Sequence, residues 1–284
     1  MKLYQNQVKV KNEKKYFGGK MVEKNQSQLQ KIKFTSKLLK TTALIDDTSL
    51  FLTYWDNDKT KEQNLQIIRD DNLLNKKSRS RVVDILKIFN QRFLFNDDVI
   101  RSLSYLQKKG VSKEVMLPLL YYFSVKNDLF LNDFVIEFLQ PRYENGQNDI
   151  PISVAVNVVK QWNEEGRTTA NWSDETVLHI AQHALATLRD FHLLEGGVNK
   201  RITPLFVPDQ AFAYLALFMS LNGINGERLV RNPEWKLFFM TPELIERFFL
   251  SCHQEGYLSY HAAGSIYRIE FSHKSLEELC HEFT

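Results

Sequence analysis

The sequence contains few cysteines and no long apolar run, and both absences restrict the class of protein. Its 284 residues include two cysteines, Cys252 and Cys280, which is too few for the disulfide framework of a small secreted domain. The most apolar stretches, residues 116–125 and 211–221, are much shorter than the about 20 apolar residues that span a bilayer. The N-terminus has lysines but no apolar segment behind them, unlike a secretory signal. We therefore expect a cytoplasmic protein with no membrane partner.

The motifs of common enzyme classes are also missing. The chain has no GxxxxGK[ST] phosphate loop, no GxGxxG after a strand and no GxSxG nucleophile elbow, which are the signatures of nucleotide-binding and hydrolase sites. Each cysteine is followed by a histidine but lacks CxxC spacing, so both thiols are interpreted as buried and structural. His179 and His183 stand four residues apart, but HIAQH lacks the glutamate of an HExxH zinc site. We expect no enzymatic activity, no catalytic residues, no cofactor and no metal.

Charge is unevenly distributed along the chain. The first 40 residues hold 11 lysines against Glu13 and Glu23, a net charge of +9, whereas the whole chain carries only +3. A basic arm on a mildly acidic body is typical of proteins whose tail adds nonspecific attraction to phosphate backbones. We predict that residues 1–32 form a flexible basic arm. The alternative is a solvated tail without a partner.

A second basic cluster precedes a helical pattern. The sequence NKKSRSR places Lys76, Lys77, Arg79 and Arg81 directly before VVDILKIFNQRF. Free backbone N–H groups and the helix dipole favour phosphate at the start of a helix. These four side chains, called the basic loop below, are therefore candidate phosphate ligands. The alternative is that they only solvate a surface turn.

Apolar spacing predicts a mainly α protein with two helical domains. From residue 34 to 139, apolar side chains recur mostly every three or four positions, which predicts about six short helices. Breaks in this pattern occur near residues 55–58, 75, 95–98, 108–110 and 126–128. The polar segment 141–151 carries two prolines and a glycine, as linkers do. We predict an all-helical domain at 33–140, a linker at 141–150 and a second domain at 151–284.

The second half has the element order of a winged helix-turn-helix. Residues 152–162 predict a short helix or strand, and Ser173 then stands as the N-cap of a long amphipathic helix. Residues 193–207 predict a β-hairpin that turns through GGVNK. Two further helices, a hairpin within 257–273 and a last helix complete the chain. We therefore expect a mainly helical second domain with a winged-helix-like segment and short β-hairpins.

The winged-helix-like segment suggests DNA as a partner, because the second helix of this motif enters the major groove by its N-terminal half. The candidate base-reading side chains on its outward face are Thr176, His179, Gln182 and His183. The candidate backbone contacts are Arg167, Thr168 and Thr169 in the preceding loop and Lys200 and Arg201 in the hairpin. Short polar side chains can hydrogen-bond base edges, and Gln can pair with adenine. The alternative is a protein-docking winged helix, since this helix lacks the lysines and arginines of strong DNA readers.

Three segments, residues 33–56, 72–93 and 171–204, resemble the BrxA family of bacteriophage-exclusion (BREX) systems. The most specific pieces are SRSR at a helix start and the succession WSxxT, LRDFxLLEG and KRI. The resemblance implies a small, mostly helical, DNA-binding accessory protein that acts beside a methyltransferase, an ATPase and a phosphatase-like protein. It implies no known catalytic residues, and a fold likened to the RNA-binding NusB. The family leads us to expect more basic residues on the long helix than this sequence has.

These observations leave three hypotheses. The first is a non-enzymatic accessory factor that binds double-stranded DNA in BREX defence. The second is an assembly adaptor that docks onto other BREX proteins, and the third is an RNA binder of the NusB kind. Salt-dependent binding to duplex separates the first from the second, and competition by RNA separates it from the third.

Overall fold

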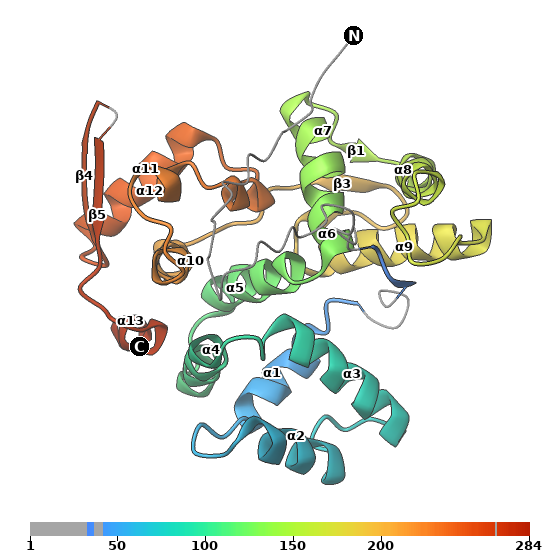
Figure 1. The fold of residues 1–284 in the computed structure, drawn as a ribbon, viewed down its shortest axis with the longest axis horizontal. Coiled ribbons are helices and arrows are strands. Elements are labelled where there is room, and N and C mark those ends of the chain that lie inside the picture. The colour runs from blue at the N-terminus through green and yellow to red at the C-terminus, as the bar shows by residue number, and fades with distance from the viewer. Residues whose placement is uncertain (1–32, 37–41, 265) are drawn as a thin grey trace, which may run out of the picture. The chain divides into compact units, whose positions relative to one another are not determined.

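The structure is a computed structural model that describes residues 33–36, 42–264 and 266–284. All of these residues belong to one compact unit, Lys33–Thr284. The predicted basic arm lies outside the described residues, so its flexibility stays a prediction. Figure 1 shows three groups of helices around the central helix α5 (Lys113–Lys126).

The helices of the first group begin and end close to the breaks predicted from the sequence. It comprises α1 (Ile45–Tyr54), α2 (Lys61–Asp70), α3 (Arg79–Arg92) and α4 (Asp97–Lys109). Thr60, Ser78 and Asn96 each accept a hydrogen bond from a backbone N–H in the first turn of α2, α3 and α4, which satisfies donors that a helix start leaves free. Helix α4 ends at Gly110, whose φ of 71° lies in the left-handed region that glycine adopts at low cost.

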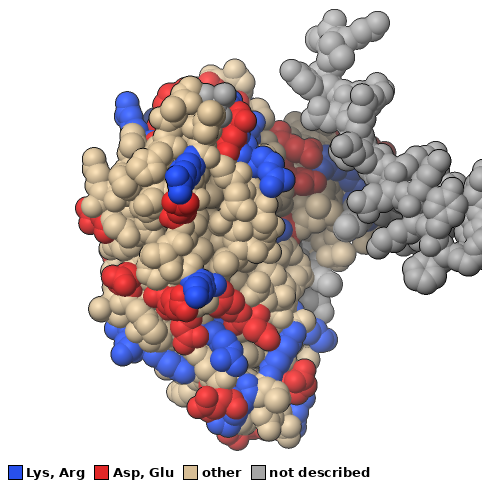
Figure 2. All heavy atoms as spheres, turned by 60° about the vertical axis from the view of Figure 1, so that its left-hand side comes forward, with Lys and Arg blue, Asp and Glu red and all other residues tan. Residues whose placement is uncertain are grey.

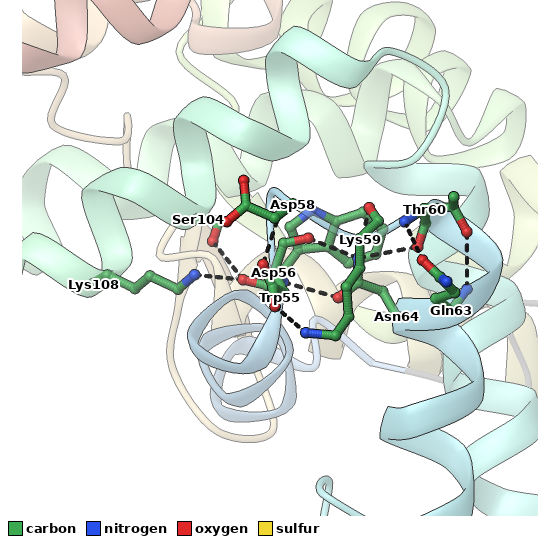
Figure 3. Close-up of polar contacts among 9 residues, drawn as sticks. All are labelled: Trp55, Asp56, Asp58, Lys59, Thr60, Gln63, Asn64, Ser104 and Lys108. Atoms are coloured by element: carbon green, nitrogen blue, oxygen red, sulfur yellow. Dashed lines mark hydrogen bonds and ion pairs between the residues drawn. The ribbon is translucent and has the colours of Figure 1, made fainter.

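Side chains fix the turn between α1 and α2 (Figure 3). The buried Asn64 accepts a hydrogen bond from the backbone N–H of Asp56 and donates to the Asp56 carbonyl, both at 2.8 Å. From α4, the Ser104 hydroxyl donates to the carbonyl of Trp55 at 3.3 Å, and Lys108 donates to the same carbonyl. The turn is therefore attached to α4, so that α1 and α4 pack in one arrangement.

The second group contains the predicted helix, loop, long helix and hairpin. Its elements are α6 (Leu129–Asp133), the π-helix η2 (Phe134–Leu139), α7 (Gln140–Glu144), β1 (Asp149–Ile150), α8 (Ile152–Glu164), α9 (Asp174–Asp190), β2 (Leu194–Glu195) and β3 (Lys200–Ile202). The strands form an antiparallel sheet in the order β1-β3-β2. The expected linker, residues 141–150, thus contains most of α7 and strand β1. Independent folding of the two predicted domains stays a prediction.

The third group completes the chain. Its elements are α10 (Asp209–Leu221), α11 (Glu227–Val230), the 3-10 helix η3 (Pro233–Phe238), α12 (Pro242–Gln254), β4 (Ser259–Ala263), β5 (Ile266–Glu270), α13 (Leu276–Cys280) and the 3-10 helix η4 (His281–Phe283). Strands β4 and β5 form the second predicted hairpin, with Ser259 opposite Glu270. The expectation of a mainly helical fold with short hairpins is confirmed. In the part of the chain that the structure describes, no helix combines the length and the apolar character needed to cross a membrane.

Helix α5 forms the centre of the core. From Val115 to Val125 every residue except Leu117 is buried, and the helix packs against α4, α6 and α10. In a buried helix, polar side chains need hydrogen-bond partners inside the protein. The Tyr121 hydroxyl donates to the carbonyl of Leu237 at 2.7 Å, whereas the buried Ser124 hydroxyl has no partner among the described residues.

Arg167, in the loop between α8 and α9, joins three parts of the chain. Its guanidinium bonds Asp133 at 2.5 Å and Glu137 at 2.7 Å. The same group lies 4.8 Å from the ring centre of Phe34 and 4.6 Å from that of Trp162, within the range of cation–π attraction. Burial lowers the pKa of Arg167, but the hydrogen bonds and charges of Glu137 and Asp133 outweigh burial and raise it. We call these five side chains the Arg167 clamp.

Tyr214→Phe tests the polar contact between α10 and α4. The Tyr214 hydroxyl shares a buried hydrogen bond of 2.7 Å with Ser102, and its loss is expected to lower the free energy of unfolding by about 1 kcal/mol. Urea denaturation measures this difference. Tyr54→Phe is the matched control, because Tyr54 is exposed; equal stability of both variants would contradict the role given to Tyr214.

Arg167→Ala tests the clamp. Removing the guanidinium leaves two carboxylates without their cation, and we expect a loss of about 2 kcal/mol in the free energy of unfolding. Arg268→Ala is the control, because Arg268 pairs with Glu270 on the surface at 2.8 Å, where ion pairs contribute little. If the free energy of unfolding falls equally in both variants, the Arg167 clamp stabilises the fold no more than a surface ion pair does.

The stability of Arg167→Ala should also depend on pH. Burial and the neighbouring Glu137 carboxylate raise the pKa of Asp133, and Arg167 opposes this effect. Without Arg167 the folded chain binds a proton at Asp133 more tightly than the unfolded chain does, so lowering the pH stabilises the folded variant relative to the wild type. We expect the stability deficit to be smaller at about pH 4.5 than at about pH 7. Urea denaturation at the two pH values measures it, and an unchanged deficit is the contrary result.

Candidate nucleic-acid interface

The scaffold of the candidate interface is α8, α9 and the β2–β3 hairpin. Ser173 caps α9 as predicted, because its hydroxyl accepts a hydrogen bond from the backbone N–H of Thr176 at 3.3 Å. Helix α8 packs against α9, and Figure 1 shows α8 end on while α9 runs across the view. Strand β1, which precedes α8, completes the sheet by pairing with β3. The element order predicted from the sequence is therefore present.

The predicted base-reading residues lie along α9. His179 and Gln182 are exposed, and Nδ1 of His179 lies 3.3 Å from Oε1 of Gln182. Thr176 is half-buried and shares a hydrogen bond of 3.0 Å with the Ser173 hydroxyl. His183 is also half-buried, and its buried Nδ1 has no hydrogen-bond partner. Among the described residues, no three His, Cys, Asp or Glu side chains are grouped to hold a metal ion.

Two carboxylates accompany these residues at the start of α9. The side chains of Asp174 and Glu175 are 88% and 83% exposed, and Asp174 lies 3.4 Å from Lys160. Acidic residues in the first turn stabilise a helix through its dipole. The same charges repel the phosphates of a nucleic acid, so this end of α9 is unfavourable for backbone contacts.

The loop residues predicted to contact DNA are engaged within the fold. Arg167 belongs to the clamp, and its side chain is 27% exposed. Thr168 is buried and donates its hydroxyl hydrogen to Asn163 at 2.8 Å. Thr169 is exposed, but its backbone N–H donates to the carbonyl of Phe34 at 2.9 Å. In this conformation Arg167 and Thr168 serve the packing of the loop.

The two cations of the hairpin differ in environment because successive residues of a strand point to opposite faces. Lys200 is 7% exposed and donates to the carbonyl of Gly197. Burial and the nearby charge of Arg189 lower the pKa of the Lys200 ammonium. Arg201 is exposed. Of the pair, Arg201 is therefore the one accessible to a phosphate.

The basic loop leads into α3 as predicted, with Arg79 as the first helical residue. The side chain of Asn72 bonds both the backbone N–H and the carbonyl of Lys76, at 3.0 and 2.9 Å, which fixes the loop. Lys76 pairs with Asp47 at 2.5 Å, and Arg79 pairs with Asp70 at 2.8 Å. Arg79 keeps 73% of its side chain exposed.

Lys77 and Arg81 complete the basic loop. Lys77 is exposed, whereas Arg81 is half-buried at the start of α3. The backbone N–H of Arg81 donates to the Ser78 cap at 3.2 Å. Lys77 and Arg79 are thus the most accessible cations of this loop.

A hollow of about 890 Å³ brings the basic loop and the hairpin to one surface. The basic loop contributes Lys76, the end of α9 contributes Arg189, and the residues around the hairpin contribute Glu195 and Thr203. We call this feature the α1–α9 hollow, because the start of α1 and the end of α9 form its opposite walls. Of the predicted basic residues, Lys76 lines this concave surface, together with Arg189, which was not predicted.

Arg189 and His192 at this hollow were not among the predicted site residues. Arg189 is exposed and lies 2.8 Å from Asp190, and His192 is exposed with a left-handed φ of 63°. The sequence held one signal for Arg189, a cation in the last turn of a capped helix directly before the hairpin. Nothing local marked the surface that it would face, because the opposite wall comes from α1.

The buried Arg92 holds that opposite wall in place. It is 2% exposed and donates to the carbonyls of Ala43 at 2.9 Å and Thr42 at 3.2 Å, both of which line the hollow. Burial lowers the pKa of Arg92 to about 10. The guanidinium remains charged at neutral pH and fixes the residues that lead into α1.

The fold resembles that of a protein whose structure has been solved. The crystal structure of an uncharacterized protein from Magnetospirillum magneticum is similar, with a TM-score of 0.56 and 12% sequence identity, over 73% of this chain and 100% of the other. At this identity the likeness concerns the fold alone. No curated protein sequence matches this chain.

The family comparison agrees with the resemblance carried by the SRSR and LRDFxLLEG segments. The profile of the BrxA family matches residues 32–217, a range that contains the basic loop, α9 and the β2–β3 hairpin. Because this match covers more than half of the chain, the protein belongs to the BrxA family and thereby to the accessory proteins of BREX phage-defence systems.

Proposed function

We propose that the protein contributes to BREX defence by binding double-stranded DNA, without catalysing a reaction. The observation that carries this proposal is the α1–α9 hollow, where Lys76 of the basic loop and Arg189 of α9 lie beside the hairpin. Cations from separate segments on one surface can follow a phosphate backbone, which a single cluster cannot. Lys77, Arg79 and Arg201 are exposed, and we propose them as further contacts to the phosphates.

The charges of this surface favour weak binding that depends strongly on salt. The carboxylates of Asp47 and Asp190 partner Lys76 and Arg189, so a phosphate must compete with an existing ion pair. Such contacts act over short distances and are screened by salt. The lysines of residues 1–40 add further nonspecific attraction in this proposal.

In this proposal, helix α9 contributes less to the affinity for DNA than the basic loop does. His179 and Gln182 remain our proposed base contacts, with Thr176 and His183 beside them, but Asp174 and Glu175 oppose phosphates at the same end. Base contacts specify sequence while phosphate contacts supply affinity. We therefore propose that the basic loop, rather than α9, determines how tightly DNA is held.

Fluorescence anisotropy with a labelled duplex tests this proposal. Binding should weaken steeply with salt, and Lys77→Ala/Arg79→Ala should lower the affinity about tenfold and reduce the salt dependence by about two phosphate contacts. Lys236→Ala/Arg268→Ala removes the same charges from exposed positions outside the candidate surface and is the matched control. An equal effect of both double variants would contradict the assignment.

Absence of binding at low salt would reject the DNA proposal. If RNA competes as well as duplex of the same length, the NusB-like alternative is favoured instead.

A second candidate function is protein docking, as an assembly adaptor. A groove of about 530 Å³ lies between residues 204–210, the end of η3 and the start of α12. Its walls include Phe206, Phe239, Leu244 and Phe248, and Phe206 is 69% exposed. Figure 2, which turns towards the viewer the side of the molecule that carries β4 and β5, shows mostly uncharged surface interrupted by scattered charged side chains. Exposed aromatic side chains of this kind are typical anchors of protein interfaces.

Phe206→Glu tests the adaptor function. We expect the variant to lose association with co-expressed BREX proteins, since a charge in the groove opposes burial of an apolar partner surface. Phe206→Leu keeps the apolar character and should retain association. Co-purification measures both, and equal recovery with Glu and Leu would argue against the groove as a docking site.

A further inference from the structure

The surface of the α1–α9 hollow is concave, whereas the outer surface of a DNA duplex is convex. Its volume of about 890 Å³ falls within the roughly 300–1,000 Å³ of pockets that enclose small ligands. The bases of a duplex are stacked and paired inside the helix, so they cannot enter such a space unless they leave the stack. A DNA strand held at this surface can therefore fill the hollow only with an unpaired nucleotide.

The walls of the hollow combine the groups that a nucleotide requires. Ala43, Leu44, Ile45 and Leu194 supply apolar surface. Lys76 and Arg189 supply cations that pair with Asp47 and Asp190 of the same lining, so a phosphate must replace these carboxylates. An apolar wall suits the face of a base, and cations suit its phosphate. This combination of apolar and charged side chains differs from a surface turn, in which the charged side chains are only solvated.

Hydrogen-bond acceptors complete the lining. Asp46 and Glu195 are exposed carboxylates at the hollow, and Thr42 and Thr203 are half-buried hydroxyl residues. Carboxylates accept hydrogen bonds from exocyclic amino groups, such as N4 of cytosine and N6 of adenine, whereas thymine presents a carbonyl at the equivalent place. The lining thus favours bases with an amino group over thymine.

We infer that the α1–α9 hollow binds one unpaired nucleotide of a DNA strand, with preference for a base that carries an exocyclic amino group. The inference rests on the proposed DNA binding and adds a substrate class to it. Lys76 and Arg189 contact the phosphate, the apolar residues contact the base, and Asp46 and Glu195 accept from its amino group. Arg92 keeps the α1 wall in position through its bonds to Thr42 and Ala43.

Three DNA probes test this inference by fluorescence anisotropy. They are a blunt duplex, the same duplex with a short oligo(dC) tail, and the same duplex with an oligo(dT) tail. We expect the dC-tailed duplex to bind about tenfold more tightly than the blunt one, the contribution of one well-held base, and the dT-tailed duplex to gain less. Equal affinity for blunt and tailed duplexes would overturn the inference while leaving DNA binding intact.

Two variants in the hollow, with a third as control, assign the effect to it. Thr203→Phe fills part of the hollow and should lower the affinity for the dC-tailed duplex more than the affinity for the blunt duplex. Thr53→Phe introduces the same side chain at an exposed position of α1 and should keep the advantage. Glu195→Ala, a smaller change, should reduce the preference for dC over dT. A tail advantage that survives both Thr203→Phe and Glu195→Ala places the nucleotide elsewhere, and failure of every probe to bind rejects the proposed function as well.

Discussion

The fold depends on the burial of nearly all of α5 from Val115 to Val125. A helix that is apolar on every side cannot lie on a surface, so it requires cover from several directions at once. Helices α4, α6 and α10, one from each group, provide that cover. The three groups are therefore fixed around one axis, and segments far apart in the sequence are brought to common surfaces. The α1–α9 hollow, with walls from the first and second groups, is one consequence.

Burial also divides the cations of the chain into two kinds. Arg92, Arg167 and Lys200 are largely withdrawn from solvent and bond carbonyls or carboxylates of the fold. Lys77 and Arg201 are exposed. A withdrawn cation stabilises the arrangement that surrounds it, since leaving its partners unpaired would be costly. An exposed cation is free to exchange its water for a phosphate, which is why Lys77 and Arg201 are proposed as DNA contacts in addition to the ion-paired Lys76 and Arg189.

Much of the local structure could be predicted because its causes are local. Ser78 and Ser173 cap helices where their side chains reach the next turn, and Gly110 ends α4 where a left-handed residue is needed. The helix, loop, helix and hairpin order followed from apolar spacing. The choice between helix and strand for residues 152–162 could not be made locally, because a short apolar run fits both until its neighbours are known.

By itself, the sequence determined the mainly helical fold, the breaks between the helices of the first group, the uneven charge and the resemblance to the BrxA family. Each depends on spacing and composition within a few turns of chain. The tertiary structure alone decided that Arg167 and Thr168 are engaged within the fold, that Lys200 is buried beside the exposed Arg201, and that Lys76 and Arg189 line one hollow. Those outcomes depend on which distant segments cover each side chain, and only the packing around α5 sets that.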